Sequence, residues 1–164
     1  MLQVSQLHQY YGGSHILRGV EFSARQGEVT CLLGRNGVGK TTLLKCLMGL
    51  IPAKQGAVNW EGQPITAFKP HQRVHAGIAY VPEERQRQGA ILSFSVRENL
   101  TLAALGRRLA GPWLRPNDER KMTEEAIGTL KIKTDGTEQI IGGLSGGNQQ
   151  KVVIAKWLGT EPRI

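Results

Sequence analysis

Residues 34–41 constrain the fold of this chain more than any other stretch. They read Gly-Arg-Asn-Gly-Val-Gly-Lys-Thr and match the pattern G-x-x-x-x-G-K-[ST] at every fixed position. The apolar run before them, residues 29–33, predicts a buried parallel strand, and residues 42–48 after them predict a helix. A glycine-rich loop between a strand and a helix is the setting in which this pattern cradles phosphates. The sequence therefore predicts a nucleoside triphosphate site, and the matching flanks disfavour an incidental glycine-rich turn.

Each part of this loop has an expected role. The glycines let successive backbone N–H groups turn towards a phosphate, and the N-terminus of the next helix adds unpaired donors and a positive dipole end. Lys40 supplies a charge for the β- and γ-phosphates, and Thr41 offers a hydroxyl to Mg²⁺. The residues expected to bind the nucleotide here are Gly34, Arg35, Asn36, Gly37, Val38, Gly39, Lys40, Thr41 and Thr42.

Composition limits the other functions open to the chain. Its 164 residues are enough for one domain with a core, and its formal net charge is +8. The basic residues are scattered and aromatic residues are few, so we expect no nucleic-acid partner. Cys31 and Cys46 are expected to fill core space, which fits a reducing cytosol. No signal peptide is recognised, and the longest apolar stretch, residues 43–51, is too short to span a membrane.

Hydrophobic patterning predicts the elements around the loop. Residues 2–7 predict an edge strand, and the alternation over residues 20–23 predicts a half-buried strand. Another strand is expected at residues 56–60, a short helix at residues 70–75 and a further strand at residues 77–81. These elements predict an α/β region that contains the phosphate loop.

The second half of the chain has a different character. Residues 83–89 are polar and charged, and we expect them to be flexible. Ser95 and Glu98 form a predicted capping box that opens a helix, and Asp118 is expected to cap a second one. Residues 83–140 are therefore predicted to form a mostly helical insert.

A second candidate anion site begins at Ser145. Gly146 and Gly147 follow this serine at the start of a predicted helix, which provides a hydroxyl, bare backbone N–H groups and a positive dipole end. The helix is apolar nearly all round over residues 152–158, so we expect it to be buried. Taken alone, the pattern fits an ordinary serine cap. Its place after a phosphate loop and a helical insert favours a second phosphate-binding device.

Together these motifs resemble the ATP-binding cassette of ABC transporters over essentially the whole chain. In that family residues 34–41 correspond to the Walker A loop. Residues 144–148, Leu-Ser-Gly-Gly-Asn, stand at the signature L-S-G-G-Q, with asparagine in the last place. The resemblance implies an α/β P-loop NTPase core with an antiparallel β subdomain and an inserted α-helical subdomain, incomplete at the C-terminus. It divides the chain into residues 1–82 (ATP-binding core), 83–141 (Q-loop region and helical subdomain) and 142–164 (signature and following helix).

The resemblance also implies ligands and partners. ATP and Mg²⁺ are the cofactors, and two cassettes pack head to tail so that each ATP lies between the Walker A loop of one and the signature of the other. A transmembrane permease would dock near residues 83–94 and hold the protein on the cytoplasmic face of the membrane. Tyr11, just before Gly12, fits the aromatic that stacks on adenine better than Tyr10 does, the alternative being a packing role. The residues expected to contact the partner's ATP are Leu144, Ser145, Gly146, Gly147 and Asn148.

The sequence departs from the family pattern in its Q-loop and in its subfamily marks. Glu83 stands where the family has glutamine; it can reach Mg²⁺ directly or through water, or be a solvated acidic loop residue. Residues 1–66 resemble urea or branched-chain amino-acid importer ATPases. Residues 77–164 resemble the second cassette of ribose- or galactose-type sugar importer ATPases. The expected function is the ATP-binding subunit of a bacterial importer for a sugar, urea or an amino acid.

A third departure concerns catalysis. Ile164 stands where the family's Walker B strand begins, so the Mg²⁺-binding aspartate, the catalytic glutamate and the switch histidine are expected beyond it. Phosphoryl transfer depends on such positioning and charge stabilisation. We therefore expect ATP binding with little hydrolysis by these residues alone. The alternative function is a non-hydrolysing nucleotide-binding fragment or regulatory module.

Overall fold

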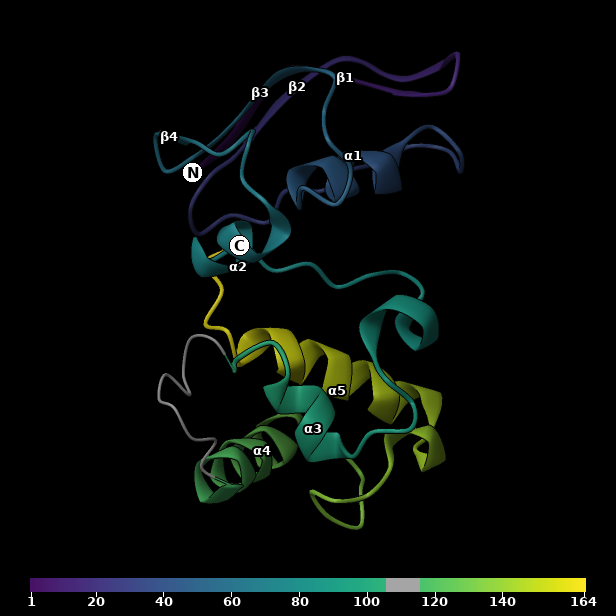
Figure 1. Cartoon of the computed structure of the whole chain (residues 1–164), viewed down its shortest axis with the longest axis vertical. Coiled ribbons are helices and arrows are strands. Elements are labelled where there is room, and N and C mark those ends of the chain that lie inside the picture. Colours follow the sequence, from purple (N-terminus) through teal and green to yellow (C-terminus); the bar gives the residue numbers. More distant parts are fainter. Residues whose placement is uncertain (106–115) are drawn as a thin grey trace. The chain divides into compact units, whose positions relative to one another are not determined.

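The computed structural model describes residues 1–105 and 116–164 (Figure 1). The chain divides into two compact units, Met1–Ala76 and Gly77–Ile164. The first combines an antiparallel sheet with two helices, and the second is helical. This agrees with the predicted fold class, which has an antiparallel β subdomain and an α-helical subdomain. No helix in the described ranges is both long and apolar enough to cross a membrane.

The sheet of the first unit has the strand order β2-β1-β3-β4, with every neighbouring pair antiparallel. Its strands are β1 (Leu2–Tyr11), β2 (Ser14–Ala24), β3 (Gln55–Trp60) and β4 (Gln63–Pro64). The prediction of an edge strand at residues 2–7 is wrong in position, because β1 is paired on both sides. Its buried residues Leu2, Val4 and Leu7 belong to the core of this unit.

Two helices accompany this sheet. Helix α1 (Lys40–Leu47) buries Leu43, Cys46 and Leu47, and Gly49, with a φ of 71°, lies just after its cap, as predicted. Helix α2 (Pro70–His75) has the predicted bounds and begins with a proline, whose fixed φ suits a first helical position. Both helices therefore follow from local sequence signals.

The predicted buried strand at residues 29–33 is wrong. This segment is in neither helix nor strand, Val29 and Leu33 are 92% and 88% exposed, and Cys31 is exposed rather than in a core. A parallel strand is stable when hydrogen-bonded neighbours and covering helices bury it. No strand of the described residues pairs with this segment, so its hydrophobicity alone does not make it a strand.

The predicted strand at residues 77–81 is also absent as a regular strand, although it pairs locally. The Ala79 N–H donates to the carbonyl of Ile164 at 2.8 Å, and the Arg163 N–H donates to the carbonyl of Gly77 at 2.7 Å. These two bonds join the first and last residues of the second unit.

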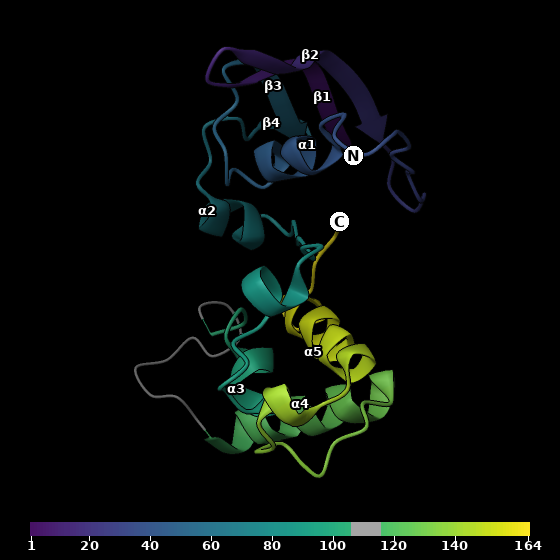
Figure 2. The ribbon, with the colours of Figure 1, turned by 90° about the vertical axis from the view of Figure 1, so that its right-hand side faces the viewer.

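The second unit is built from helices, as predicted (Figure 2). Its elements are the π-helical turn η1 (Arg85–Gly89), α3 (Val96–Thr101), α4 (Pro116–Leu130), the 3₁₀ turn η2 (Ile141–Gly143) and α5 (Gly146–Leu158). The turn η1 occupies the segment that the sequence predicts to be flexible. Helix α5 is less buried than predicted, since Leu158 is 51% exposed. The core of this unit consists of Val96, Leu100, Ile132, Ile141, Leu144, Val152 and Ala155.

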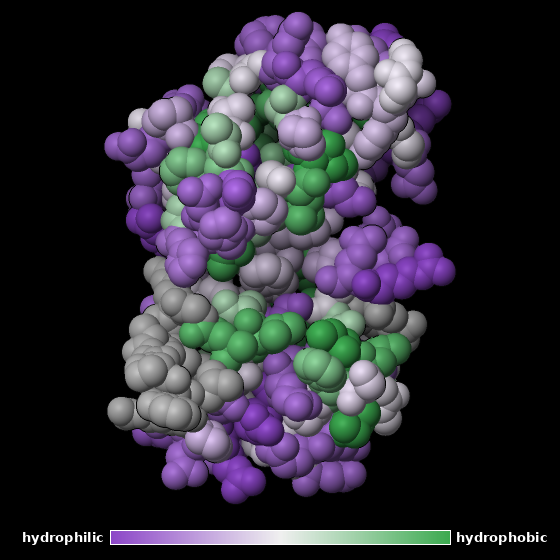
Figure 3. All heavy atoms as spheres, in the orientation of Figure 1, coloured by the Kyte–Doolittle hydropathy of each residue, from purple (hydrophilic) through white to green (hydrophobic). Residues whose placement is uncertain are grey.

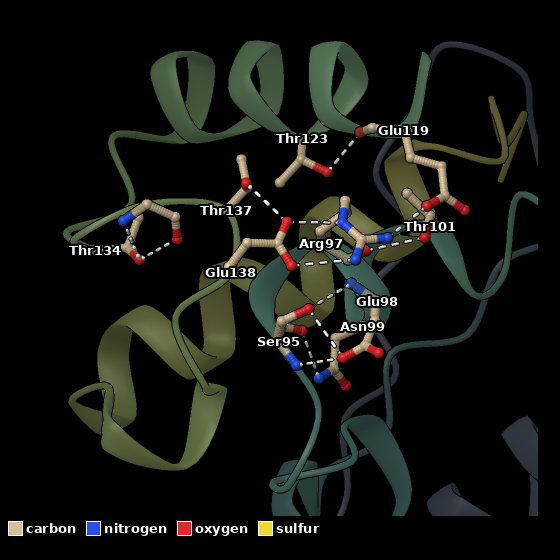
Figure 4. A network of polar contacts seen from close by, with 11 residues as sticks. Ser95, Arg97, Glu98, Asn99, Thr101, Glu119, Thr123, Thr134, Thr137 and Glu138 are labelled. Atoms are coloured by element: carbon tan, nitrogen blue, oxygen red, sulfur yellow. Dashed lines mark hydrogen bonds and ion pairs between the residues drawn. The ribbon is translucent and has the colours of Figure 1, made fainter. Parts of the chain in front are cut away.

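A capping box opens α3, as the sequence predicts (Figure 4). The Ser95 hydroxyl oxygen accepts the Glu98 N–H at 3.1 Å, and the Glu98 carboxylate accepts the Ser95 N–H at 2.8 Å. The Ser95 hydroxyl also donates to the Glu98 carboxylate at 2.9 Å, and the bonds that the carboxylate accepts from the Ser95 N–H and hydroxyl lower the pKa of Glu98 below its ordinary value.

Arg97 joins α3 to the elements around it (Figure 4). Its guanidinium lies 2.6 Å from the Glu119 carboxylate on α4 and makes two bonds, of 2.8 and 3.1 Å, to Glu138. A forked contact of this kind fixes the orientation of both groups. Glu119 is almost fully buried, and Arg97 gives its carboxylate an oppositely charged partner.

Candidate functional site

The phosphate loop ends against β2. Gly39 is the N-cap of α1 and has a φ of 102°, a conformation that side chains rarely adopt. A Cβ at this position would also lie 3.0 Å from Ile16 Cγ2 and 3.2 Å from Leu17 Cδ2. Glycine is therefore required by both the backbone and the packing, and it fixes where the loop meets α1.

Lys40 folds back across the start of the loop. Its Nζ donates to the carbonyl of Gly34 at 2.6 Å and to the carbonyl of Arg35 at 2.9 Å. An ammonium group carries three donors, so these two bonds leave one for another acceptor. The geometry holds a positive charge over the loop, where an anion would benefit from it.

The N-terminus of α1 adds backbone donors beside this charge. The first helical bond runs from the Leu43 N–H to the Gly39 carbonyl at 2.8 Å, so the N–H groups of residues 40–42 precede it. Within the described chain, no side chain caps this end, and its first turn carries no acidic residue. Thr41 is exposed and offers its hydroxyl, whereas Thr42 is buried and offers its backbone N–H.

Tyr11 is better placed for stacking than Tyr10. The Tyr10 ring is already stacked on His15, with centroids 4.1 Å apart and an interplanar angle of 13°. Tyr11 ends β1 and is 49% exposed. Figure 1 shows the β1–β2 turn and the loop before α1 at the same end of the first unit.

The second predicted device lies at the start of α5, in the second unit. Ser145 is the N-cap and is exposed, yet its side chain accepts no N–H from the helix backbone in the part of the chain described. Its Oγ is instead 3.0 Å from Asn148 Nδ2. Ser95, by contrast, uses its Oγ as a cap. The ordinary serine cap left open by the sequence is therefore not the arrangement found.

The other signature residues divide into packed and open positions. Leu144 is buried in the core of the second unit, so its side chain anchors the motif. A Cβ added at Gly147 would meet no atom of the described residues within 4 Å. Packing within the described part of the chain therefore does not explain this glycine, whereas close approach of an anion to its backbone would.

Glu83 is exposed in the second unit. The pKa of Tyr80 is raised above its ordinary value, first by burial of the phenol and second by the negative charge of Glu83. The described residues contain no group of three or more His, Cys, Asp or Glu side chains able to hold a metal. A role for Glu83 with Mg²⁺ would thus depend on the nucleotide as a further ligand.

Arg73 supports the site and carries no signal in the sequence. It is 2% exposed, and its guanidinium donates to the carbonyls of Cys46 and Leu47 at the end of α1, at 3.0 and 2.6 Å. It also donates to the carbonyls of Phe68 and Thr66, at 3.1 and 2.9 Å. The arginine therefore satisfies the C-terminal end of the helix that carries Lys40 at its start.

The α5 helix also contacts the turn η1 through a hydrogen bond and through close packing. Lys156 donates to the Gly89 carbonyl, and a Cβ on Gly89 would lie 3.2 Å from both methyl groups of Val153. Burial lowers the pKa of Lys156. This contact, like that of Arg73, joins a side chain to a distant backbone carbonyl, which sequence patterns do not reveal.

Comparison with known proteins identifies the family. The sequence model of the ABC transporter family matches residues 17–164. The chain is 44% identical over 146 residues to the ribose import ATP-binding protein RbsA of Pseudomonas putida, covering 89% of this chain and 28% of that protein. It is 39% identical over 145 residues to RbsA of Oceanobacillus iheyensis, covering 88% of this chain and 29% of that one. The chain thus spans less than a third of the length of these relatives.

Solved structures agree with this result. The crystal structure of the ADP conformation of MJ1267, an ATP-binding cassette of an ABC transporter, is 28% identical with a TM-score of 0.75, covering 98% of this chain and 65% of that one. The dimeric structure of MJ0796, a bacterial ABC transporter cassette, has a TM-score of 0.83 at 21% identity, covering 99% and 71%, and shows the shared fold. The predicted P-loop NTPase fold is confirmed, and the chain belongs to the ABC transporter family as an ATP-binding cassette.

Proposed function

We propose that this chain binds ATP in a bacterial ABC importer and that the transported solute is a sugar. The observation that carries the proposal is the phosphate loop, where Lys40 lies across the backbone beside the bare N-terminus of α1. Charge and aligned N–H groups together suit the β- and γ-phosphates. Mg²⁺ would be held by Thr41, whose hydroxyl is exposed in the first turn.

The choice of a sugar rests on the relatives. The sequence resemblance is divided between importers of urea or amino acids in residues 1–66 and importers of sugars in residues 77–164. The RbsA proteins, which match 88–89% of the chain, are named for ribose import. A match of this extent favours sugar import over the other two solutes.

The proposed partners are a second cassette and a permease. With the second cassette, the chain would form a head-to-tail pair in which Ser145 and the exposed Gly147 contact the ATP held by the other cassette. For the permease, Figure 3 shows apolar residues gathered on the face of the second unit turned to the viewer. Its exposed apolar residues after η1 include Ile91, Leu92 and Phe94. They would contact the permease and place the cassette on the cytoplasmic side of the membrane.

Binding of a fluorescent ATP analogue tests the site. Lys40→Ala removes the charge over the loop, and we expect affinity to fall by about 10- to 100-fold, the value of a hydrogen bond between charged groups. Lys54→Ala, an exposed lysine in the same unit, is the matched control. Equal affinity of the wild type and Lys40→Ala would refute the site.

Uptake measurements test the solute. Cells with and without the gene are compared for uptake of labelled ribose, urea and leucine. Loss of ribose uptake alone supports the proposal, and loss of urea or leucine uptake instead would replace the solute.

A further inference from the structure

Asn148 occupies the last position of the signature, and its side chain turns into the chain's own second unit. Its Oδ1 accepts the backbone N–H of Lys133 at 3.0 Å, and its Nδ2 donates to Ser145 Oγ at 3.0 Å. Lys133 follows α4 and lies far from the signature in sequence. The amide therefore bridges two segments.

The orientation of this amide is determined by its partners. A backbone N–H can only donate, so the atom of Asn148 that faces Lys133 must be the oxygen. The atom that faces Ser145 is then the NH₂ group, which can only donate. The Lys133 N–H thus excludes the flipped amide.

The consequence falls on the Ser145 hydroxyl. This group has one hydrogen and two acceptor lone pairs. The NH₂ group of Asn148 donates to one lone pair of the Ser145 oxygen. The Ser145 hydrogen then points away from Asn148, because a donor cannot accept it. Ser145 is exposed, so the free direction leads outwards, where a phosphate oxygen can accept.

We propose that Asn148 is a positioning residue that directs the Ser145 hydroxyl hydrogen towards a phosphate and does not itself contact the nucleotide. The inference rests on the proposed function, in which Ser145 meets the ATP of a second cassette. It assigns the side chain of Asn148 a role different from that of a nucleotide ligand.

The anchor at Lys133 is firmly held. Ile132, its neighbour, is 5% exposed within the core of the second unit. Lys151, one turn after Asn148 on α5, donates to the Lys131 carbonyl at 2.7 Å. Asn148 and Lys151 of α5 thus bond the backbone on either side of the buried Ile132. These bonds hold the segment in place, so the N–H that orients the Asn148 amide is fixed.

ATP-dependent pairing of the protein is the readout, measured by sedimentation in ATP with EDTA so that hydrolysis does not intervene. The variants are Ser145→Ala, Asn148→Ala, Asn148→Asp and the double Ser145→Ala/Asn148→Ala, with Asn117→Ala, an exposed asparagine on α4, as the control. We expect Ser145→Ala to weaken pairing about tenfold and Asn148→Ala about three- to tenfold. Asn148→Asp should weaken it more than Asn148→Ala, because its carboxylate accepts the hydroxyl hydrogen that the phosphate needs.

The double variant separates positioning from direct contact. If Asn148 acts through Ser145, the double variant pairs no worse than Ser145→Ala alone. Additive losses, or wild-type pairing by Asn148→Asp, would overturn the inference. Thermal unfolding of each variant measures any structural effect, which would persist in the Ser145→Ala background.

Failure of the proposed function gives a different result. Pairing by Lys40→Ala equal to that of the wild type, or no pairing of the wild type with ATP, would refute the ATP-bridged pair and the inference with it. If Lys40→Ala loses pairing, and the losses of pairing in Ser145→Ala and Asn148→Ala add up in the double variant, only the positioning role of Asn148 is refuted.

Discussion

Replacing Arg73 with methionine tests how the phosphate-loop helix is held in place. The arginine is 2% exposed, and its guanidinium donates to the backbone carbonyls of Cys46, Leu47, Phe68 and Thr66. Methionine fills similar space but donates no hydrogen bond, so these carbonyls lose their charged partner. Burial lowers the pKa of the guanidinium, yet arginine keeps its charge in proteins.

The expected loss follows from these contacts. A hydrogen bond from a charged donor contributes about 1.5–3 kcal/mol, and the burial of the charge itself opposes this gain. Water can reach some of the freed carbonyls, so we expect the free energy of unfolding to fall by about 3–5 kcal/mol rather than by the full sum. Arg73→Lys should recover only part of it, because one ammonium cannot span carbonyls on several sides.

Urea unfolding monitored by far-ultraviolet circular dichroism measures this loss, and binding of the fluorescent ATP analogue measures its effect on the loop. Hydrogen exchange over residues 40–49 reports the loosening of α1 directly. Arg18→Met, an exposed arginine in the same unit with one bond to the His15 carbonyl, is the control. A change below about 1 kcal/mol for Arg73→Met would refute the reasoning, since surface substitutions fall in that range.

Two further predictions concern the loop and the helical unit. Gly39→Ala should weaken binding of the ATP analogue at least tenfold and lower the melting temperature, because its φ of 102° and its closeness to Ile16 both disfavour a Cβ. Gly147→Ala is the control: this glycine is exposed in the second unit and a Cβ there meets no described atom within 4 Å, so the melting temperature should stay unchanged. Since the pKa of Glu98 is lowered in the folded state, the stability it contributes is present above its ordinary value of 4.5 and is lost as the pH falls below that value. Acid titration of Glu98→Gln should therefore show a flatter loss of helical signal below pH 4.5, and a curve identical to that of the wild type would contradict this assignment.

Local signals in the sequence predicted local structure well. The capping box at Ser95 and Glu98, the bounds of α2 and the glycine after α1 each depend on residues within one or two helical turns. These features could be predicted since their chemistry is complete within a short segment. The phosphate loop is equally local, because Lys40 contacts the carbonyls of its own loop, and its binding of a nucleotide stays a prediction.

Features that depend on distant partners could not be predicted in the same way. The central place of β1 is set by pairing with β2 and β3, and the exposure of residues 29–33 is set by the lack of a paired strand in the described chain. Arg73 reaches the Cys46 carbonyl 27 residues away, and Asn148 reaches Lys133 across 15. Side chain–backbone bonds of this span leave no periodicity in the sequence, so only the folded structure reveals them.

The exposed segment at residues 29–33 has a consequence for how the protein behaves at high concentration. Val29, Leu32 and Leu33 are exposed apolar residues on a backbone that no strand of the described chain engages. Apolar side chains beside free N–H and C=O groups are the combination from which sheets between molecules grow. We expect self-association by this route to rise with protein concentration and to need no nucleotide, whereas the proposed ATP-bridged pair would form only with ATP.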